Sequence, residues 1–103
     1  MGELVKLDRA RQIKRAKKRI KELFKEGLVE YPEHAVARLL ERGLDMNDIR
    51  HVIRSGSVTK GGLNAFPRTP RRYMLEGKGV DGGEIVCIVD INGALVLVTA
   101  WVK

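Results

Sequence analysis

Apolar residues in the first half of the chain recur every three or four positions, which is the spacing of one face of an α-helix. Residues 1–28 predict a basic amphipathic helix, because lysines fill the side opposite its apolar face. Residues 32–56 predict two further short helices that end at Gly43 and Gly56, the second opened by a capping box at residues 45–48. The apolar face of the first helix comprises Ile13, Ala16, Ile20, Leu23 and Phe24.

From Ser57 onward the periodicity changes to that of strands, which are expected over residues 71–76, 85–91 and 94–102, after a loop at 60–67. Asn92-Gly93 is typical of a two-residue hairpin turn, so Ile91 is expected to pair with Ala94. Counting outward, one hairpin face is wholly apolar and belongs under the helices, whereas the face with Trp101 stays open to a ligand or partner. The expected apolar pairs are Val89 with Val96, Cys87 with Val98, and Ile85 with Ala100.

Together these elements predict an α+β fold in one domain over residues 1–103. Three N-terminal helices are expected to cover one face of a three- to four-stranded antiparallel sheet built from residues 57–103. A chain of 103 residues is long enough for a single hydrophobic core.

Charge adds a basic stripe to this picture. The chain has 20 Lys and Arg against 13 Asp and Glu, a formal net charge of +7. No acid occurs between Asp48 and Glu76, and such a stripe favours a nucleic-acid or acidic-protein partner, although an ordinary solvated surface is the alternative. The bases in this interval are Arg50, Arg54, Lys60, Arg68, Arg71 and Arg72.

Composition also excludes several classes of protein. The single Cys87 lies in an apolar strand and excludes a disulfide scaffold, and no metal-ligand motif is readable. The N-terminus is charged from Glu3 onward and no apolar run is long enough to span a bilayer. We therefore expect a cytoplasmic protein with no membrane association, no metal and no cofactor.

Candidate chemistry begins with a histidine–arginine pair. Metal-free RNA cleavage needs a base, an acid and a cation that stabilises the phosphate. His34 and Arg38 are one turn apart on a predicted helix, so they share a face, and Arg42 repeats the spacing. The alternative is that His34 only caps the helix or packs on the sheet while Arg38 pairs with acids.

Three spaced segments carry a family resemblance: His34-Ala35-x-x-Arg38-x-x-Glu41-Arg42-Gly43-Leu44, then Asp48-Ile49-x-x-Val52-Ile53-x-x-Gly56, then Arg72-Tyr73-x-Leu75-x-Gly77. This set resembles a small toxin-like domain of the DUF4258 type, similar to MqsR and more distantly to the RelE and ParE toxins of type II toxin–antitoxin systems. The resemblance implies a metal-independent ribonuclease that cuts mRNA, free or on the ribosome, and is silenced by a cognate antitoxin of acidic or zinc-finger type.

The resemblance also extends the set of candidate residues. It implies that Lys60 matches the basic residue before the sheet and Lys103 the basic C-terminal end, while Val86 replaces the tyrosine of the middle strand and Tyr73 is the nearest substitute. The candidate catalytic residues are His34, Arg38, Lys60, Arg72, Tyr73 and Lys103. The candidate nucleic-acid-binding residues are Arg42, Arg54, Arg68, Arg71, Lys78 and Trp101. Two alternatives stay open: a non-catalytic basic binding module, and a ParE-like gyrase inhibitor.

Overall fold

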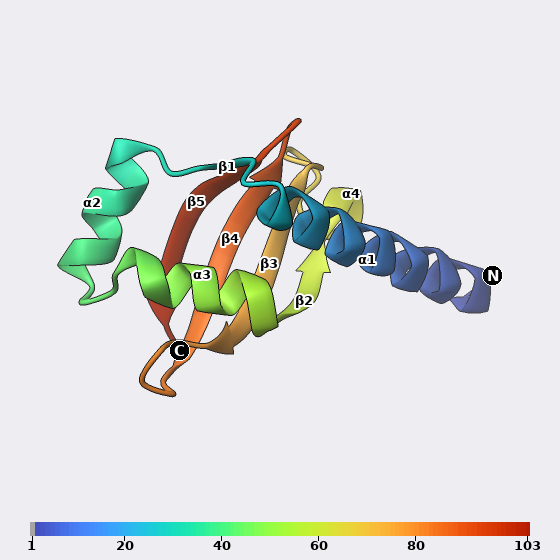
Figure 1. The fold of residues 1–103 in the computed structure, drawn as a ribbon. Helices are drawn as coiled ribbons and strands as arrows, with labels where there is room; N and C mark the ends of the chain where they lie inside the picture. The colour runs from blue at the N-terminus through green and yellow to red at the C-terminus, as the bar shows by residue number, and fades with distance from the viewer. Residues whose placement is uncertain (1) are drawn as a thin grey trace.

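The computed structural model describes the backbone of residues 2–103 and the side chains of residues 9–103. The chain is an α+β fold with a five-stranded mixed sheet in the order β1-β5-β4-β3-β2 (Figure 1). Strand β1 pairs in parallel with β5, and the other neighbours are antiparallel. In chain order the elements are α1 (Gly2–Lys25), β1 (Val29–Glu30), α2 (Glu33–Glu41), α3 (Met46–Ser55), β2 (Ser57–Gly61), α4 (Gly62–Ala65), β3 (Arg72–Lys78), β4 (Glu84–Ile91) and β5 (Leu95–Val102).

The α+β class is therefore confirmed, and the prediction of three to four antiparallel strands is compatible with the sheet but not exact: β2, β3, β4 and β5 pair antiparallel, and β1 adds a fifth, parallel strand. Both edge strands were missed. Strand β1 has only two residues, too few to show a period, and it exists because Val29 and Glu30 pair with Leu95 and Val96 far along the chain. At the other edge, β2 begins at Ser57 and ends inside the segment 60–67 that is expected to be a loop, and the short helix α4 fills residues 62–65 of that segment.

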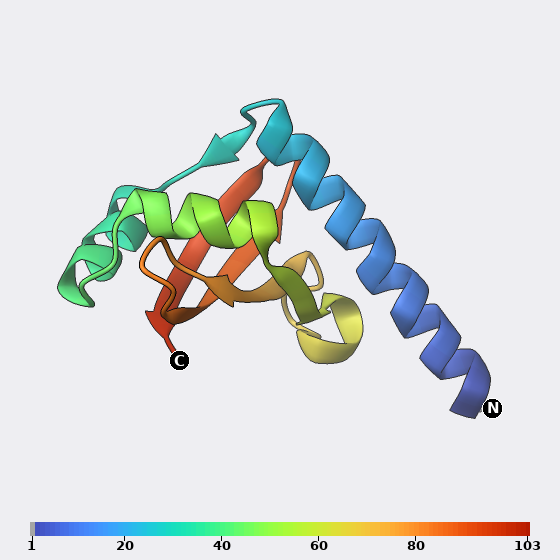
Figure 2. The ribbon, with the colours of Figure 1, turned by 60° about the horizontal axis from the view of Figure 1, so that its bottom comes forward.

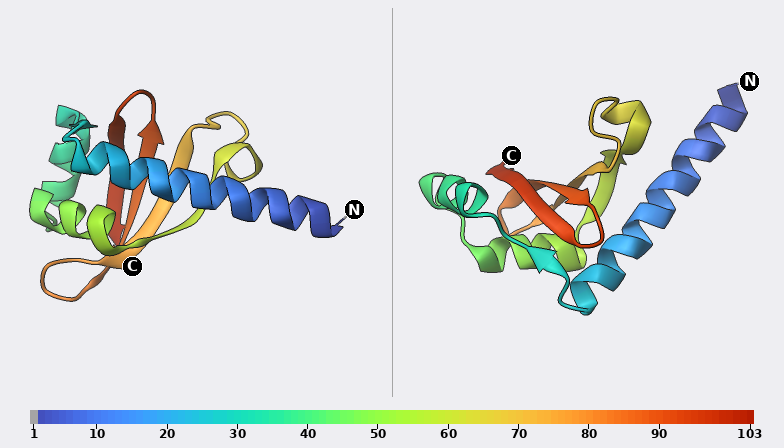
Figure 3. Two further views of the ribbon diagram at one scale, coloured as in Figure 1. Left: turned by 45° about the vertical axis from the view of Figure 1, so that its right-hand side comes forward. Right: turned by 90° about the horizontal axis from the view of Figure 1, so that it is seen from above.

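Helices α1 and α3 cover one face of the sheet, and α2 lies beside β5 (Figures 2 and 3). Four of the five residues predicted for the apolar face of the first helix are confirmed, since Ala16, Ile20 and Leu23 are buried and Phe24 packs against them, whereas Ile13 is half-buried outside the core cluster. Helix α2 also buries Ala35 and Leu39 in the core cluster that α1 and α3 share, so the expectation of three N-terminal helices over one face is compatible with the structure but not exact, because α2 packs at β5. Its last turn is followed by Arg42, whose guanidinium donates to the carbonyl oxygen of Ala100 on β5 at 2.7 Å. Within residues 2–103, no helix is both long enough and apolar enough to cross a membrane.

Helix α3 begins with the predicted capping box. The Asp45 carboxylate accepts hydrogen bonds from the backbone N–H groups of Asn47 and Asp48, and the Asp48 carboxylate accepts one from the Asp45 N–H. The other oxygen of Asp48 accepts a hydrogen bond from the Val80 N–H at 3.0 Å. The same side chain thus starts α3 and ties it to the turn between β3 and β4.

The hairpin register differs from the prediction. Ile91 pairs with Leu95, so the connection has three residues, Asn92 to Ala94, instead of two. A two-residue type I′ turn needs positive φ at both central positions, and only Gly93 has it, at 74°. Leu95 and Leu97 are therefore buried, in place of the expected Val96 and Val98.

A β-bulge on β5 reverses this shift further along the hairpin. The register changes between Ile88 and Val89, which leaves Val98 as the extra residue on β5. Beyond the bulge Ala100 returns to the buried face, opposite Cys87 instead of the predicted Ile85. Trp101 consequently keeps its predicted place on the other face, although its partner is Val86 and not Glu84.

Gly77 offers a test of how closely α3 packs on the sheet. A Cβ at Gly77 would lie 2.9 Å from the Gly56 Cα and 3.6 Å from the Val52 Cα, and neither backbone atom can move without shifting the helix. We expect Gly77→Ala to lower the free energy of unfolding by about 1–3 kcal/mol, as overpacking does. Urea denaturation would measure the loss.

The matched control is Gly83→Ala, where the nearest atom to a new Cβ is an oxygen of Asp81 at an ordinary 3.6 Å. This variant is expected to keep or slightly raise stability, because alanine restricts the unfolded chain. Equal stability of the two variants would contradict the close packing of α3 on β3.

Candidate active site

The sheet face opposite α1 and α3 carries the polar side chains that the sequence analysis singled out on the strands. Alternation along β3 puts Tyr73 and Leu75 in the helical core, so Arg72, Met74 and Glu76 lie on the opposite face. The register adds Asp90, Ile88 and Val86 of β4 beside them. We call this surface the open face.

The centre of the open face is apolar. Val86 and Ile88 are only 4% and 6% exposed, yet they belong to no part of the helical core cluster. Their burial comes from neighbours on the adjacent strands: Met74 pairs with Ile88 on one side, and Trp101 pairs with Val86 on the other. Trp101 is half-buried, so part of its surface remains available.

An ion pair flanks this centre at the end where β3 begins. Arg72 donates from Nε to one carboxylate oxygen of Asp90 at 2.9 Å and from Nη2 to the other at 3.1 Å. This hydrogen bonding raises the pKa of Arg72, against a smaller opposing effect of burial. The pair fixes the plane of the guanidinium while using two of its five N–H donors, which leaves three for a ligand.

A second ion pair lies at the other end of the open face. The ammonium of Lys103 is 3.0 Å from the carboxylate of Glu76. The hydrogen bond from Lys103 lowers the pKa of Glu76, helped by a hydrogen bond from Thr59 and by the charge of Lys60. Glu76 in turn raises the pKa of Lys103. At neutral pH this end of the face therefore holds an ionised carboxylate and a cation.

Two further cations reach the open face from its two sides. Lys60 of β2 pairs with Met74, so it stands on the same face as Arg72 and Glu76. Arg42, just after α2, donates to the hydroxyl oxygen of Thr99 at 2.9 Å. Within residues 9–103, neither side chain forms an ion pair.

The open face thus brings together three of the six candidate catalytic residues: Lys60, Arg72 and Lys103. Tyr73 points to the opposite face, where it is 9% exposed and packs in the core. His34 and Arg38 are exposed on α2, one turn apart as predicted. Within residues 9–103 neither of them has a side-chain hydrogen bond or an ion pair, so nothing ties them to the open face.

The candidate binding residues are dispersed. Arg42 and Trp101 belong to the open face, whereas Arg54 lies in the last turn of α3, Arg68 lies in the loop before β3, and Lys78 ends β3. Arg71 points away from Arg72 and donates to the side-chain oxygen of Asn92 at 2.5 Å. A basic stripe along the sequence is therefore not one surface in space.

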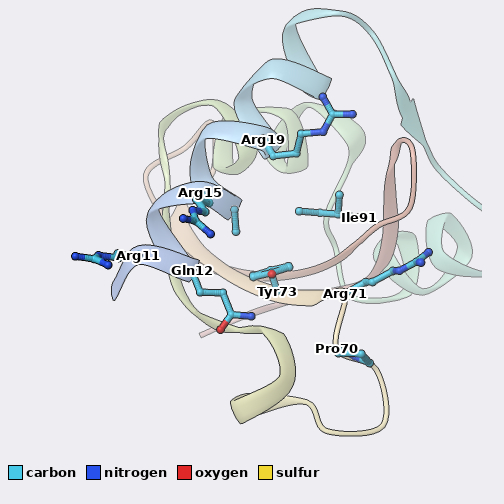
Figure 4. A pocket seen from close by; sticks show the side chains of 9 residues that line it. Arg11, Gln12, Arg15, Arg19, Pro70, Arg71, Tyr73 and Ile91 are labelled. Carbon is cyan, nitrogen blue, oxygen red and sulfur yellow. The ribbon is translucent and has the colours of Figure 1, made fainter. Parts of the chain in front are cut away.

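Arg71 and Tyr73 line a second site, a groove between α1 and the start of β3 (Figure 4). We call it the arginine groove. Its volume is about 650 Å³. The lining residues are Arg11, Gln12, Arg15, Ala16, Arg19, Pro70, Arg71, Tyr73 and Ile91.

Sequence reasoning did not select Asp90, Glu76 and Thr99 as site residues, nor Gln12 and the three arginines of α1 that line the groove. Asp90 and Glu76 were not selected because their ion-pair partners depend on the β3–β4 register across a glycine-rich turn. The three arginines do recur every four residues, and this spacing was a usable signal.

The described part of the chain offers no cluster for a metal. Among residues 9–103, no three His, Cys, Asp or Glu side chains lie close enough together to hold an ion. Cys87 is fully buried, and burial raises the pKa of its thiol to about 12, so it stays protonated. The chemistry available on the open face is that of cations, carboxylates and one exposed aromatic edge.

Comparisons with known proteins agree with the fold. No curated protein matches the sequence. Among solved structures, the chain is similar to the Brucella abortus ribonuclease toxin BrnT, with a TM-score of 0.52 and 21% sequence identity over 73% of this chain and 94% of that one. A family model described as a domain of unknown function matches residues 31–102, well over half of the chain. The expectation of a DUF4258-type domain is thereby confirmed: the chain belongs to the DUF4258 family.

Proposed function

We propose that this chain is the toxin of a type II toxin–antitoxin system and cleaves mRNA without a metal ion. The fold likeness to BrnT, described as a ribonuclease toxin, supports this proposal, as does the formal net charge of +7. Within that class we assign it to the MqsR/RelE-like toxins. A cognate antitoxin of acidic or zinc-finger type would silence it in the cytoplasm.

The observation that carries the proposal is the convergence of cations on the open face. Arg72, Lys60 and Lys103 come from separate parts of the chain and surround an apolar centre. A phosphodiester held there meets a guanidinium whose plane is already fixed by Asp90, and arginine's fork matches phosphate oxygens. Such preorganised charge stabilises a transition state without further rearrangement.

The reaction we propose is an internal transesterification. The 2′-oxygen attacks the adjacent phosphorus and forms a new P–O bond, while the bond from phosphorus to the 5′-oxygen breaks. The 2′-hydroxyl proton goes to a base and the departing 5′-oxygen receives a proton. The products are a 2′,3′-cyclic phosphate and a 5′-hydroxyl.

We assign roles by position on the open face. Arg72 and Lys60 bind the phosphate and stabilise its extra charge. Glu76 is assigned to accept the 2′-hydroxyl proton and Lys103 to donate to the leaving oxygen, because they are the carboxylate and the cation that meet at that end of the face. Trp101 offers a surface on which a base stacks. His34 and Arg38 on α2 form the competing acid–base pair, and the experiments below separate the two.

The first prediction concerns activity in chelator. Purified protein is expected to cut single-stranded RNA in EDTA and to leave cyclic phosphate ends, and its expression alone should arrest growth. Product ends can be identified by mass spectrometry. Growth arrest with intact RNA would instead indicate a gyrase inhibitor, and neither arrest nor cleavage would indicate a non-catalytic binding module.

The second prediction concerns Arg72. Arg72→Lys keeps the charge but removes the two-pronged geometry, so cleavage should fall by about 10²–10³, the usual loss for one transition-state donor. Single-turnover cleavage rates would measure it. The same exchange at Arg50, an exposed residue of α3, is the matched control and should leave the rate unchanged. Thermal melts check that both variants fold.

The third prediction uses His34→Ala to distinguish a catalytic site on the open face from one on α2. A lost acid–base catalyst lowers the chemical step by about 10²–10⁴. The proposal expects near-normal cleavage by this variant and a large loss in Glu76→Gln. The reverse pattern would move the chemistry to His34 and Arg38.

A further inference from the structure

The arginine groove is a concentrated positive surface outside the open face. Nine bases and one acid, Glu22, occupy residues 9–25 of α1. The bases are Arg9, Arg11, Lys14, Arg15, Lys17, Lys18, Arg19, Lys21 and Lys25. Arg11, Arg15 and Arg19 follow one another at intervals of about 6 Å along the helix and line the groove together.

The groove combines a cationic rim with an apolar floor. Buried Ala16 and Tyr73 form the floor with Ile91, and the hydroxyl of Tyr73 lies between Gln12 and Arg71 (Figure 4). A volume of about 650 Å³ is within the range of small-molecule sites and is large enough for a nucleotide. Its lining thus offers guanidinium donors, an amide, a phenol and a flat apolar surface.

Among residues 9–103, no carboxylate lines the groove, so its four arginines are poorly compensated within that part of the chain. Arg19 is 3.7 Å from Glu22 in an exposed pair, and Arg71 bonds to a neutral amide. Within residues 9–103, Arg11 and Arg15 form no ion pair. Like charges one helical turn apart repel each other. An anionic ligand would relieve this repulsion.

The groove is continuous with the open face at the start of β3. Arg71 lines the groove and its neighbour Arg72 stands on the open face. A hollow of about 330 Å³ joins them, since its lining includes Pro70 and Arg71 of the groove and also Asp90, the partner of Arg72. A linear polyanion can therefore run from one site to the other, which a short acidic side chain cannot.

We propose that the arginine groove binds a single-stranded polynucleotide, with its arginines on the phosphates, and so holds the substrate beside the open face. The identity of that strand as RNA rests on the proposed function. The α1 residues of the groove precede the segment that the family model matches, whereas Pro70, Arg71, Tyr73 and Ile91 lie inside it. Tyr73 and Arg71 thereby act in binding and not in the chemical step.

The test separates binding from cleavage by using a 2′-O-methyl RNA of about 12 nucleotides, which has no free 2′-hydroxyl and is within the usual site size of single-strand binders. Fluorescence anisotropy measures its affinity at several salt concentrations. Arg11→Gln/Arg15→Gln is expected to weaken binding about tenfold or more. It should also reduce the salt slope by about 1.4, or about 0.7 for each lost phosphate contact.

Lys14→Gln/Lys18→Gln is the matched control, because it removes two charges at the same spacing on α1 from side chains outside the groove. It should change affinity less than about threefold, with a smaller change in salt slope. Glutamine keeps helix propensity in both variants. A DNA strand of the same sequence should show the same loss as RNA, because phosphates are the proposed contacts.

Three results would overturn the inference. Equal weakening by both double variants would mean general charge attraction. Unchanged RNA affinity in the arginine variant would exclude the groove as a polynucleotide-binding site. If that variant also lost binding to poly-glutamate, the groove would instead be assigned to an acidic protein segment. A loss seen with DNA alone would contradict an RNA role. RNA cleavage by the wild-type chain is assayed separately. This assay tests the proposed function by itself, so a failure of the proposed function can be told apart from a failure of the groove proposal.

Discussion

Ile85, Cys87 and Val89 of β4 point into the helical core, while Val86 and Ile88 of the same strand are buried on the opposite face. Strand β4 can bury apolar side chains on both of its faces only when a strand flanks it on each side and helices cover one face. Strands β3 and β5 supply the flanks, and α1 and α3 supply the cover. The open face follows from this arrangement, because the second apolar row is shielded by neighbouring side chains instead of a helix.

The charged pairs of the open face follow from the same alternation. Once Tyr73 and Leu75 are committed to the core, Arg72 and Glu76 must stand on the other side, at the two ends of the apolar row. Asp90 orients one of them and Lys103 partners the other. The fold therefore supplies a surface with an apolar centre and charged ends. The proposed chemistry uses this arrangement, which results from the burial of β4.

Local signals in the sequence were enough for the helices. The apolar spacing of the first helix and the Asp45–Asp48 capping box both depend on residues a few positions apart, and both are confirmed. Long-range features were harder to predict. Strand β1 exists only through its pairing with β5, and the hairpin register depends on φ at Asn92 and Gly93 and on the bulge at Val98.

The residues of the candidate site show the same difference between local and long-range signals. Arg72 and Lys60 could be selected from charge and spacing, but their meeting on one face depends on strand pairing. His34 and Arg38 show a clear helical spacing, yet spacing alone does not say what the exposed face of α2 meets. Tyr73 was selected for its chemistry next to Arg72, and strand alternation separates the two by the thickness of the sheet.

The central claim is that RNA engages the open face, and backbone NMR of the isotope-labelled protein tests it most directly. Titration with a non-cleavable RNA should shift the amide signals of β3, β4 and β5 around Arg72, Ile88 and Thr99, together with the indole N–H of Trp101. Signals of α2 around His34 and Arg38 should move little. Shifts confined to α2, with the strand signals unchanged, would contradict the account.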